Sequence, residues 1–214
     1  MMKFCFHKTK KNTVYFIFFV ILSDMFFVPS DFDIKPGYFR NESKLHGALH
    51  TYRVMCIVLV MGEKMNLVHP VRLAFCAAFI HDMARRHDGF CIMHGPRAAR
   101  EKVPEFTPLF NKYGFDDEDI NTIKTAVSNH SQYIELRRNH PHYLVTSLLK
   151  DADALDRIRL GEGNLNPKFF RNEVSMELKD FSRNLFFMSE KVPVTGFGTM
   201  LNIAQELYDS ELII

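Results

Sequence analysis

The sequence predicts an all-α fold, and three observations support this prediction. From about residue 44 onward, apolar residues recur at three- and four-residue steps, the spacing that places them on one face of a helix. No stretch alternates between apolar and polar residues as a half-buried strand would. The chain also has only 10 glycines and 9 prolines in 214 residues, too few for a turn-rich β-barrel. This length fits one domain, or one domain with a short appendage.

Helical patterns follow one another along the chain, and glycine or proline separates most of them. Ser43 is a candidate N-cap for the first helix, and Gly62 a candidate end. The acidic run at 116–119 favours a helix start, because negative charge is stabilised at the amino-terminal end of a helix. Pro104 and Pro108 are expected to bracket a turn. The predicted helices cover residues 44–62, 71–84, 96–102, 117–130, 141–159, 174–191 and 200–212.

The composition is that of an ordinary globular protein and excludes several classes. Hydrophobic residues make up 47% and charged residues 24%, which excludes wholesale disorder. The net charge is +2, so no basic field indicates a nucleic-acid partner. The four cysteines form no CxxC, and Cys56 and Cys76 lie in apolar runs, which is typical of free buried thiols. This cysteine usage favours a reducing, cytoplasmic location.

Residues 1–40 differ from the rest and are predicted to form an N-terminal segment before a helical domain at 41–214. Nine of the 21 phenylalanines lie within the first 39 residues, and four lysines precede an apolar run at 14–22. The pattern is similar to an export signal, but no small-residue cleavage site follows it. The run is too short to span a bilayer, which needs about 20 apolar residues. Open alternatives are an export signal, an anchor with weak membrane contact, a packing segment, or an extension upstream of a start at Met25.

Histidine is the unusual residue, since nine of the ten lie between His46 and His142. The predicted helix at 71–84 has an interior that is apolar on every side, which makes it central to the core, and near its end stand His81 and Asp82. Two polar side chains directly after a core helix are costly to bury unless they are satisfied. A metal ion satisfies both, because imidazole nitrogen and carboxylate oxygen are common ligands. A hydrogen-bonded pair that closes the helix is the alternative.

Two further predicted helices carry polar residues among apolar ones. His50 lies on the first helix, with His46 one turn earlier on the same face. A later helix carries Asp151, Asp153 and Asp156, whose angular spacing prevents all three from facing solvent together. An inward carboxylate, an inward histidine and the buried His–Asp pair can therefore converge on one cation.

The order His … His-Asp … Asp on consecutive helices resembles the HD-domain metal-dependent phosphohydrolase superfamily. The resemblance runs from about residue 45 to residue 161 and implies an all-α bundle with a metal site between its core helices. Asp153 is expected to be the last ligand because the superfamily uses the Asp of this A-D pair, with Asp151 as the alternative. His46 and Asp156 are expected to support the ligands. The matching residues are His50 in H-T-Y-R-V, the pair His81-Asp82, and Asp153 in A-D-A-L.

His94 and His130 fit members of the superfamily that have a two-metal centre, where they would hold a second metal or contact the substrate. The resemblance implies one or two divalent ions, of Mn, Fe, Co, Ni or Zn, because such sites prefer these metals to Mg. The GYP string of cyclic-di-GMP hydrolases is absent, and Arg85 stands where some nucleotidases have an acidic residue. The general base is therefore open. The carboxylates considered for catalysis are Asp82, Asp88 and Asp151.

Several basic side chains lie beside this frame and are candidates to contact a substrate phosphate. Arg97 follows Gly95 at a predicted helix start, where backbone N–H groups and a guanidinium can both meet a phosphate. The candidates are Arg53, Arg86, Arg97 and Lys150.

The resemblance implies a hydrolase that cleaves a phosphomonoester or phosphodiester, with a nucleotide or related small molecule as the expected substrate. A di-iron oxygenase on the same fold is the first alternative, because that activity also uses six His and Asp ligands. A non-catalytic domain that senses nucleotides or binds a partner is the second alternative. The intact ligand set argues against this last one, because buried ligands without a metal are costly to keep.

Overall fold

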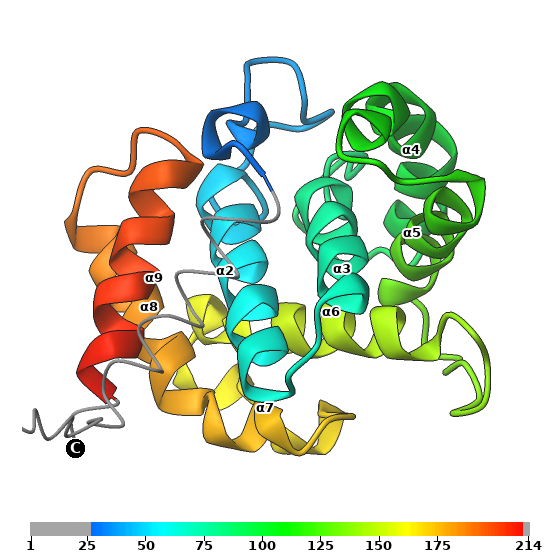
Figure 1. Cartoon of the computed structure of the whole chain (residues 1–214). Helices are drawn as coiled ribbons and strands as arrows, with labels where there is room; N and C mark the ends of the chain where they lie inside the picture. The colour runs from blue at the N-terminus through cyan, green and yellow to red at the C-terminus, as the bar shows by residue number, and fades with distance from the viewer. Residues whose placement is uncertain (1–26, 212–214) are drawn as a thin grey trace, which may run out of the picture.

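The computed structural model describes residues 27–211, and this part of the chain is all-α, as the sequence predicts (Figure 1). No strand is present among these residues. The α-helices are α2 (Ala48–Lys64), α3 (His69–Ile80), α4 (His94–Lys112), α5 (Asp117–His130), α6 (Tyr143–Leu155), α7 (Val174–Glu177), α8 (Lys179–Lys191) and α9 (Phe197–Glu211). Short 3-10 helices cover Pro29–Phe32, Asp156–Leu160, Glu162–Asn164 and Pro167–Phe169.

Helices α2 and α3 lie side by side in the middle of the molecule, and α6 crosses behind them in contact with both (Figure 1). The pair α4 and α5 packs on one side of this centre, and α8 and α9 lie on the other (Figure 1). Helix α3 buries every residue from 73 to 80, which confirms its central place, and α2 buries every residue from 50 to 62. Polar side chains on the inner faces of α2 and α6 therefore enter the interior.

Helix α4 is continuous where the sequence analysis placed a short helix and a turn, so that prediction was wrong. Pro104 and Pro108 lie inside the helix. Both prolines are on its exposed face, where water can satisfy the carbonyl groups that lose their partners. On the opposite face Val103, Phe106 and Phe110 are buried, and their packing holds the helix together.

Other element boundaries also differ from the prediction. Helix α2 begins at Ala48, because the Ser43 hydroxyl accepts hydrogen bonds from Leu45 N and His46 N and so caps a turn before the helix. Gly62 does not end α2, which continues to Lys64. The helix predicted at 141–159 is α6 followed by a 3-10 helix, and the one predicted at 174–191 is divided into α7 and α8.

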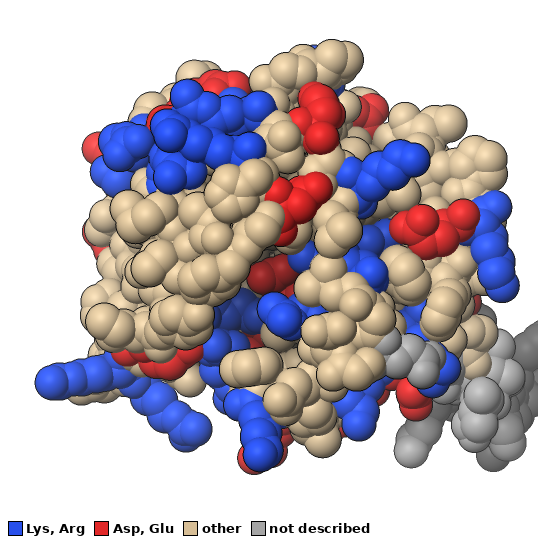
Figure 2. Space-filling view, turned by 180° about the vertical axis from the view of Figure 1, so that it is seen from behind, with Lys and Arg blue, Asp and Glu red and all other residues tan. Residues whose placement is uncertain are grey.

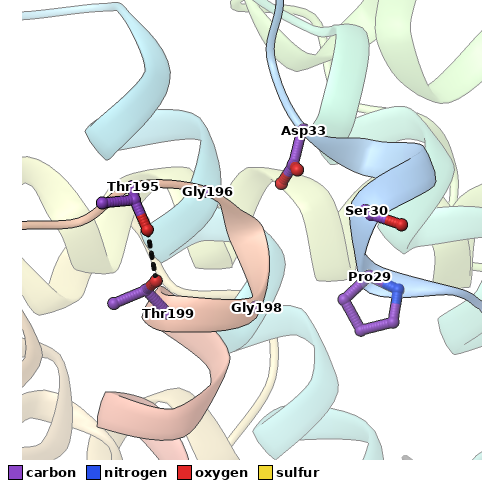
Figure 3. A pocket seen from close by; sticks show the side chains of 7 residues that line it. All are labelled: Pro29, Ser30, Asp33, Thr195, Gly196, Gly198 and Thr199. Carbon is purple, nitrogen blue, oxygen red and sulfur yellow. Dashed lines mark hydrogen bonds between the residues drawn. The ribbon is translucent and has the colours of Figure 1, made fainter.

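Residues 27–40, which the sequence analysis grouped with the N-terminal segment, pack against the helical domain. Phe32 is fully buried and contacts the rings of Phe75 and Phe79 on α3. The Asp33 carboxylate accepts a hydrogen bond of 2.8 Å from Phe197 N at the start of α9, beside an open pocket (Figure 3). Gly196 permits this close approach, since a Cβ there would lie 2.5 Å from Asp33 Oδ1.

No helix among residues 27–211 is both long enough and apolar enough to cross a membrane. The apolar run at 14–22 and Met25 lie outside the described residues, so the alternatives that rest on them stay as predictions.

A capping box at the start of α5 generates the first testable prediction. Asp116 Oδ1 accepts from Asp119 N at 2.9 Å, and Asp119 Oδ2 accepts from Asp116 N at 3.3 Å. Replacing Asp116 by alanine is expected to lower the free energy of unfolding by about 1 kcal/mol, because a helix-end N–H loses its acceptor. Urea denaturation followed by circular dichroism measures the change. Asp117→Ala removes the same charge without this hydrogen bond, and an equal effect of both variants would contradict the capping role.

Candidate metal centre

Six side chains from five helical regions converge between the core helices. His50 comes from the first turn of α2, and Asp153 comes from the last turn of α6. His81 and Asp82 directly follow the last residue of α3, because the apolar helix ends at Ile80. The remaining two are His94, the first residue of α4, and His130, the last residue of α5. All of them are buried except Asp153, whose side chain is 30% exposed.

One half of the centre consists of His50, His81, Asp153 and one oxygen of Asp82. The Nε2 atoms of His50 and His81 are 3.1 Å apart. His50 Nε2 lies 3.4 Å from Asp153 Oδ1 and 3.5 Å from Asp82 Oδ2. These are the four residues that the sequence analysis assigned to the first metal, and the structure brings them together.

The other half consists of His94, His130 and the second oxygen of Asp82. The Nε2 atoms of these two histidines are 2.9 Å apart. Asp82 Oδ1 lies 3.1 Å from His94 Nε2 and 3.8 Å from His130 Nε2. Asp82 therefore stands between the halves, with one carboxylate oxygen toward each, and Oδ1 accepts no hydrogen bond from the described residues.

The orientation of each imidazole is fixed through its Nδ1 atom. Nδ1 of His81 lies 2.6 Å from Ala78 O, and Nδ1 of His130 lies 2.6 Å from Val127 O. His94 Nδ1 contacts the Cys91 carbonyl in the same way. A carbonyl oxygen can only accept, so Nδ1 carries the proton in these three rings and Nε2 presents a lone pair to the centre. His50 Nδ1 lies 2.7 Å from Asp156 Oδ2, which gives it the same orientation.

These contacts make the centre fit a metal ion. In each half, two Nε2 lone pairs face one another at about hydrogen-bond distance with no proton between them. Uncompensated buried acceptors are costly, and a cation satisfies them all. Two triads have ligand atoms within 4.8 Å of one another, namely His50 with His81 and Asp153, and His81 with Asp82 and His130. Imidazole and carboxylate ligands of this kind suit divalent transition metals.

The electrostatic environment keeps the ligands in their metal-binding forms. Burial lowers the pKa of His81 to about 4, and burial together with the neighbouring His130 lowers the pKa of His94 to about 3. Burial raises the pKa of Asp153, but His50 and Arg159 outweigh it and the net pKa is lowered. At neutral pH these imidazoles are neutral and this carboxylate is ionised, which are the forms that bind metals.

Asp156 and Arg53 form a buried pair behind His50. Asp156 accepts from Arg53 Nε at 2.7 Å as well as contacting His50, so the structure gives it the supporting place that the sequence analysis expected. Arg53 does not face the centre and was wrongly taken as a phosphate contact. Its Nη1 reaches Ser189 and Glu190 on α8, so it holds Asp156 in place and is itself buried.

Asp151 and Lys150 are not part of the centre. Asp151 accepts hydrogen bonds from the backbone N–H groups of Arg171 and Asn172 and from the Ser175 hydroxyl, which attaches α6 to α7 and to the segment before it. Its two oxygens are therefore occupied, which argues against Asp151 as a ligand or a general base. Lys150 donates to Glu135 at 2.7 Å and is buried, so it is not placed to contact a substrate phosphate either.

Asp88 and His46 lie at the rim. Asp88 Oδ1 accepts from the Ser43 hydroxyl at 2.5 Å and lies 3.1 Å from His46 Nδ1. The His46 ring packs edge-on against the His50 ring, with centroids 6.0 Å apart. Asp88 is therefore connected to the centre through His46, and its side chain is 48% exposed.

Two arginines that the sequence analysis did not assign border the centre. Arg85 Nη1 lies 3.5 Å from Asp82 Oδ1, and Arg159 Nη2 lies 3.9 Å from Asp153 Oδ1. Arg85 lies three residues after Asp82, and this spacing could have identified Arg85 from the sequence as a neighbour of the centre. Besides Arg53, the sequence analysis proposed Arg86 and Arg97. Arg86 is exposed, and Arg97 Nη1 is buried without a hydrogen-bond partner among the described residues.

Comparisons with known proteins identify the family of the chain. No curated protein matches the chain. Among solved structures, a predicted HD superfamily hydrolase from an uncultured Thermotogales bacterium is similar, with 19% identity over 83% of this chain and 88% of the other and a TM-score of 0.49. The family model described as the HD domain matches residues 47–158, more than half of the chain and the part that supplies all six converging residues. The chain therefore belongs to the HD domain family.

Proposed function

We propose that this protein is a metal-dependent phosphohydrolase that cleaves a small phosphomonoester or phosphodiester, with a nucleotide as the expected substrate. The observation that carries the proposal is the convergence of four imidazole Nε2 atoms on the two oxygens of Asp82. Membership in the HD domain family supports the same reaction class.

His50, His81, Asp82 and Asp153 would hold one divalent ion, of Mn, Fe, Co, Ni or Zn. When bound, such an ion supplies a nucleophilic water at neutral pH and stabilises negative charge on a phosphoryl oxygen. The protein contributes the fixed ligand set, and Asp156 keeps the Nε2 atom of His50 directed at it. Asp88, partly exposed at the rim, stays a candidate for accepting the proton.

Positive charge near the centre supports an anionic substrate. Arg85 and Arg159 each place a guanidinium within 4 Å of a carboxylate of the centre. On the face seen in Figure 2, a hollow has acidic atoms in its floor, and Lys and Arg side chains lie below it and to its right. Such an arrangement attracts phosphate esters from solution. The pocket of Figure 3 contains none of the six converging residues, so we do not assign it to this reaction.

A pair of exposed aromatic rings supports a nucleotide in particular. Phe90 and Tyr133 are each 77% exposed and stack with ring centroids 6.0 Å apart. Phe90 lies four residues before His94, and Tyr133 lies three residues after His130. The two loops are tied together because the Ser131 hydroxyl donates to Ile92 O at 2.7 Å. Exposed aromatic rings beside a phosphate site are suited to stack on a nucleobase.

The first test separates hydrolysis from oxygen chemistry. Purified protein loaded with Mn²⁺ or Co²⁺ is expected to release phosphate or nucleoside from a nucleotide panel under strict anaerobiosis, at the rate seen in air. Asp82→Ala is expected to lose both the metal and this activity, because Asp82 faces both halves of the centre. Product formation only with iron, with stoichiometric oxygen consumption, would instead support a di-iron oxygenase. Ligand-induced stabilisation without turnover of any substrate would support a non-catalytic binding domain.

The second test compares two aspartates of α6. Asp153→Asn is expected to lose metal and turnover together, because its carboxylate lies against His50 Nε2. Asp151→Asn is expected to keep the metal but to lower the free energy of unfolding by about 3 kcal/mol, because a buried, paired carboxylate is lost. Metal content by mass spectrometry and urea denaturation measure the two effects. The reverse pattern would move the ligand to Asp151.

The third test concerns the aromatic pair. Phe90→Ala and Tyr133→Ala are each expected to raise KM for a nucleotide about tenfold, because base stacking on an aromatic ring is lost. KM for ribose 5-phosphate, which has no base, is expected to stay unchanged. Phe187→Ala, which removes another exposed ring on α8, is the control. Equal losses on both substrates would show that the loops position the centre and do not bind a base.

A further inference from the structure

We propose that the guanidinium of Arg85 takes the place of a second metal ion, so that the centre holds a single divalent ion in the half formed by His50, His81, Asp82 and Asp153. This inference rests on the metal centre of the proposed function and determines how many ions it contains. It concerns the half with His94 and His130, which the sequence analysis left open between a second metal and a substrate contact.

Arg85 lies inside that half. Its side chain is only 10% exposed, and its Nη1 atom lies 3.0 Å from Nδ1 and 3.1 Å from Nε2 of His94. The same atom lies 3.5 Å from Asp82 Oδ1, and Nη2 donates to Gly89 O at 3.1 Å. The guanidinium therefore stands against two of the atoms that a second metal would need.

The position of the guanidinium relative to the His94 ring shows how Arg85 would oppose a second metal. His94 Nδ1 donates its proton to the Cys91 carbonyl, which leaves the ring one lone pair, that of Nε2. Because Arg85 Nη1 is almost equally far from the two ring nitrogens, the guanidinium lies against the ring and not along this lone pair. That lone pair is also the only one with which His94 could bind a metal. Asp82 Oδ1, the other ligand atom on this side, accepts no hydrogen bond and is balanced by the positive charge of Arg85. The guanidinium therefore places a fixed positive charge beside both ligand atoms, and this charge disfavours a second cation there.

The two halves differ in how closely a guanidinium approaches their imidazole nitrogens. In the first half, the rings of His50 and His81 contact one another, carboxylates and a carbonyl group within the described residues. Arg159 borders this half, with Nη2 3.9 Å from Asp153 Oδ1. Its Nε donates to Leu45 O and its Nη1 to Asp156 O, so its hydrogen bonds go to carbonyl groups and not to the ring nitrogens. Because an arginine cannot lose its proton, its charge repels a divalent ion nearby in the buried second half. The first half therefore holds the metal.

Metal stoichiometry tests the proposal without reference to turnover. Metal-free protein titrated with Mn²⁺ in a calorimeter is expected to bind about one ion per chain, and Arg85→Gln about two. The electron paramagnetic resonance spectrum of bound Mn²⁺ is expected to be mononuclear in the unmodified protein and spin-coupled in Arg85→Gln. Arg86→Gln, which removes the neighbouring exposed charge, is the control and is expected to keep about one ion.

A second measurement leaves Arg85 in place, since Arg85→Gln also loses the contact with Gly89. His94→Ala is expected to keep the bound ion, and Asp153→Asn is expected to lose it. Two ions in the unmodified protein, one ion in a folded Arg85→Gln, or loss of the ion in His94→Ala would each overturn the role of Arg85. Failure of the unmodified protein to bind Mn²⁺, Co²⁺, Zn²⁺ or Fe²⁺ would overturn the proposed function itself.

Discussion

The constraint on which the rest of the structure depends is the burial of Asp82 between two pairs of unprotonated imidazole nitrogens. Such an arrangement is unfavourable on its own, because buried lone pairs face one another without protons. It persists only where the surrounding packing fixes every ring and a cation supplies the missing charge. The close packing of α2, α3 and α6, and the position of α5 beside them, thus serve to hold ligand atoms at short distances.

Helix ends provide most of this positioning. His81, His94 and His130 each direct Nδ1 at the carbonyl of the residue three positions earlier. For His81 and His130 this carbonyl lies in the last turn of a helix, where it has no intrahelical partner and is free to accept. His50 lies in the first turn of α2, where the carbonyl three residues earlier, that of Gly47, already accepts from Thr51 N, so the orientation of His50 requires a side chain from elsewhere. Asp156, 106 residues later in the chain, supplies it.

This difference explains what the sequence could predict. Helix periodicity predicted the all-α fold, and the resemblance of the order His50, His81-Asp82 and Asp153 to the HD-domain superfamily predicted the residues that the structure brings together. The roles of Arg53 and Lys150 were not, because their partners lie far away in the chain, on α8 for Arg53 and in the loop after α5 for Lys150. Both looked like free cations beside the motif, and only tertiary packing shows that their charges are already paired. Pro104 and Pro108 misled the prediction of α4 for a related reason, because packing of its opposite face outweighs the local cost of proline.

The three aspartates of the α6 region show how one short segment serves three purposes through rotation alone. Successive residues turn by about 100°, so Asp153 is rotated by about 200° from Asp151 and lies within about 60° of Asp156. Asp153 and Asp156 accordingly both reach His50, one at Nε2 and the other at Nδ1. Asp151 points the other way and binds the backbone before α7. The spacing thus places a ligand and its supporting carboxylate on one side of the helix and a structural anchor on the other. A shift of one residue in this segment would therefore disturb the metal centre and the packing of α7 together.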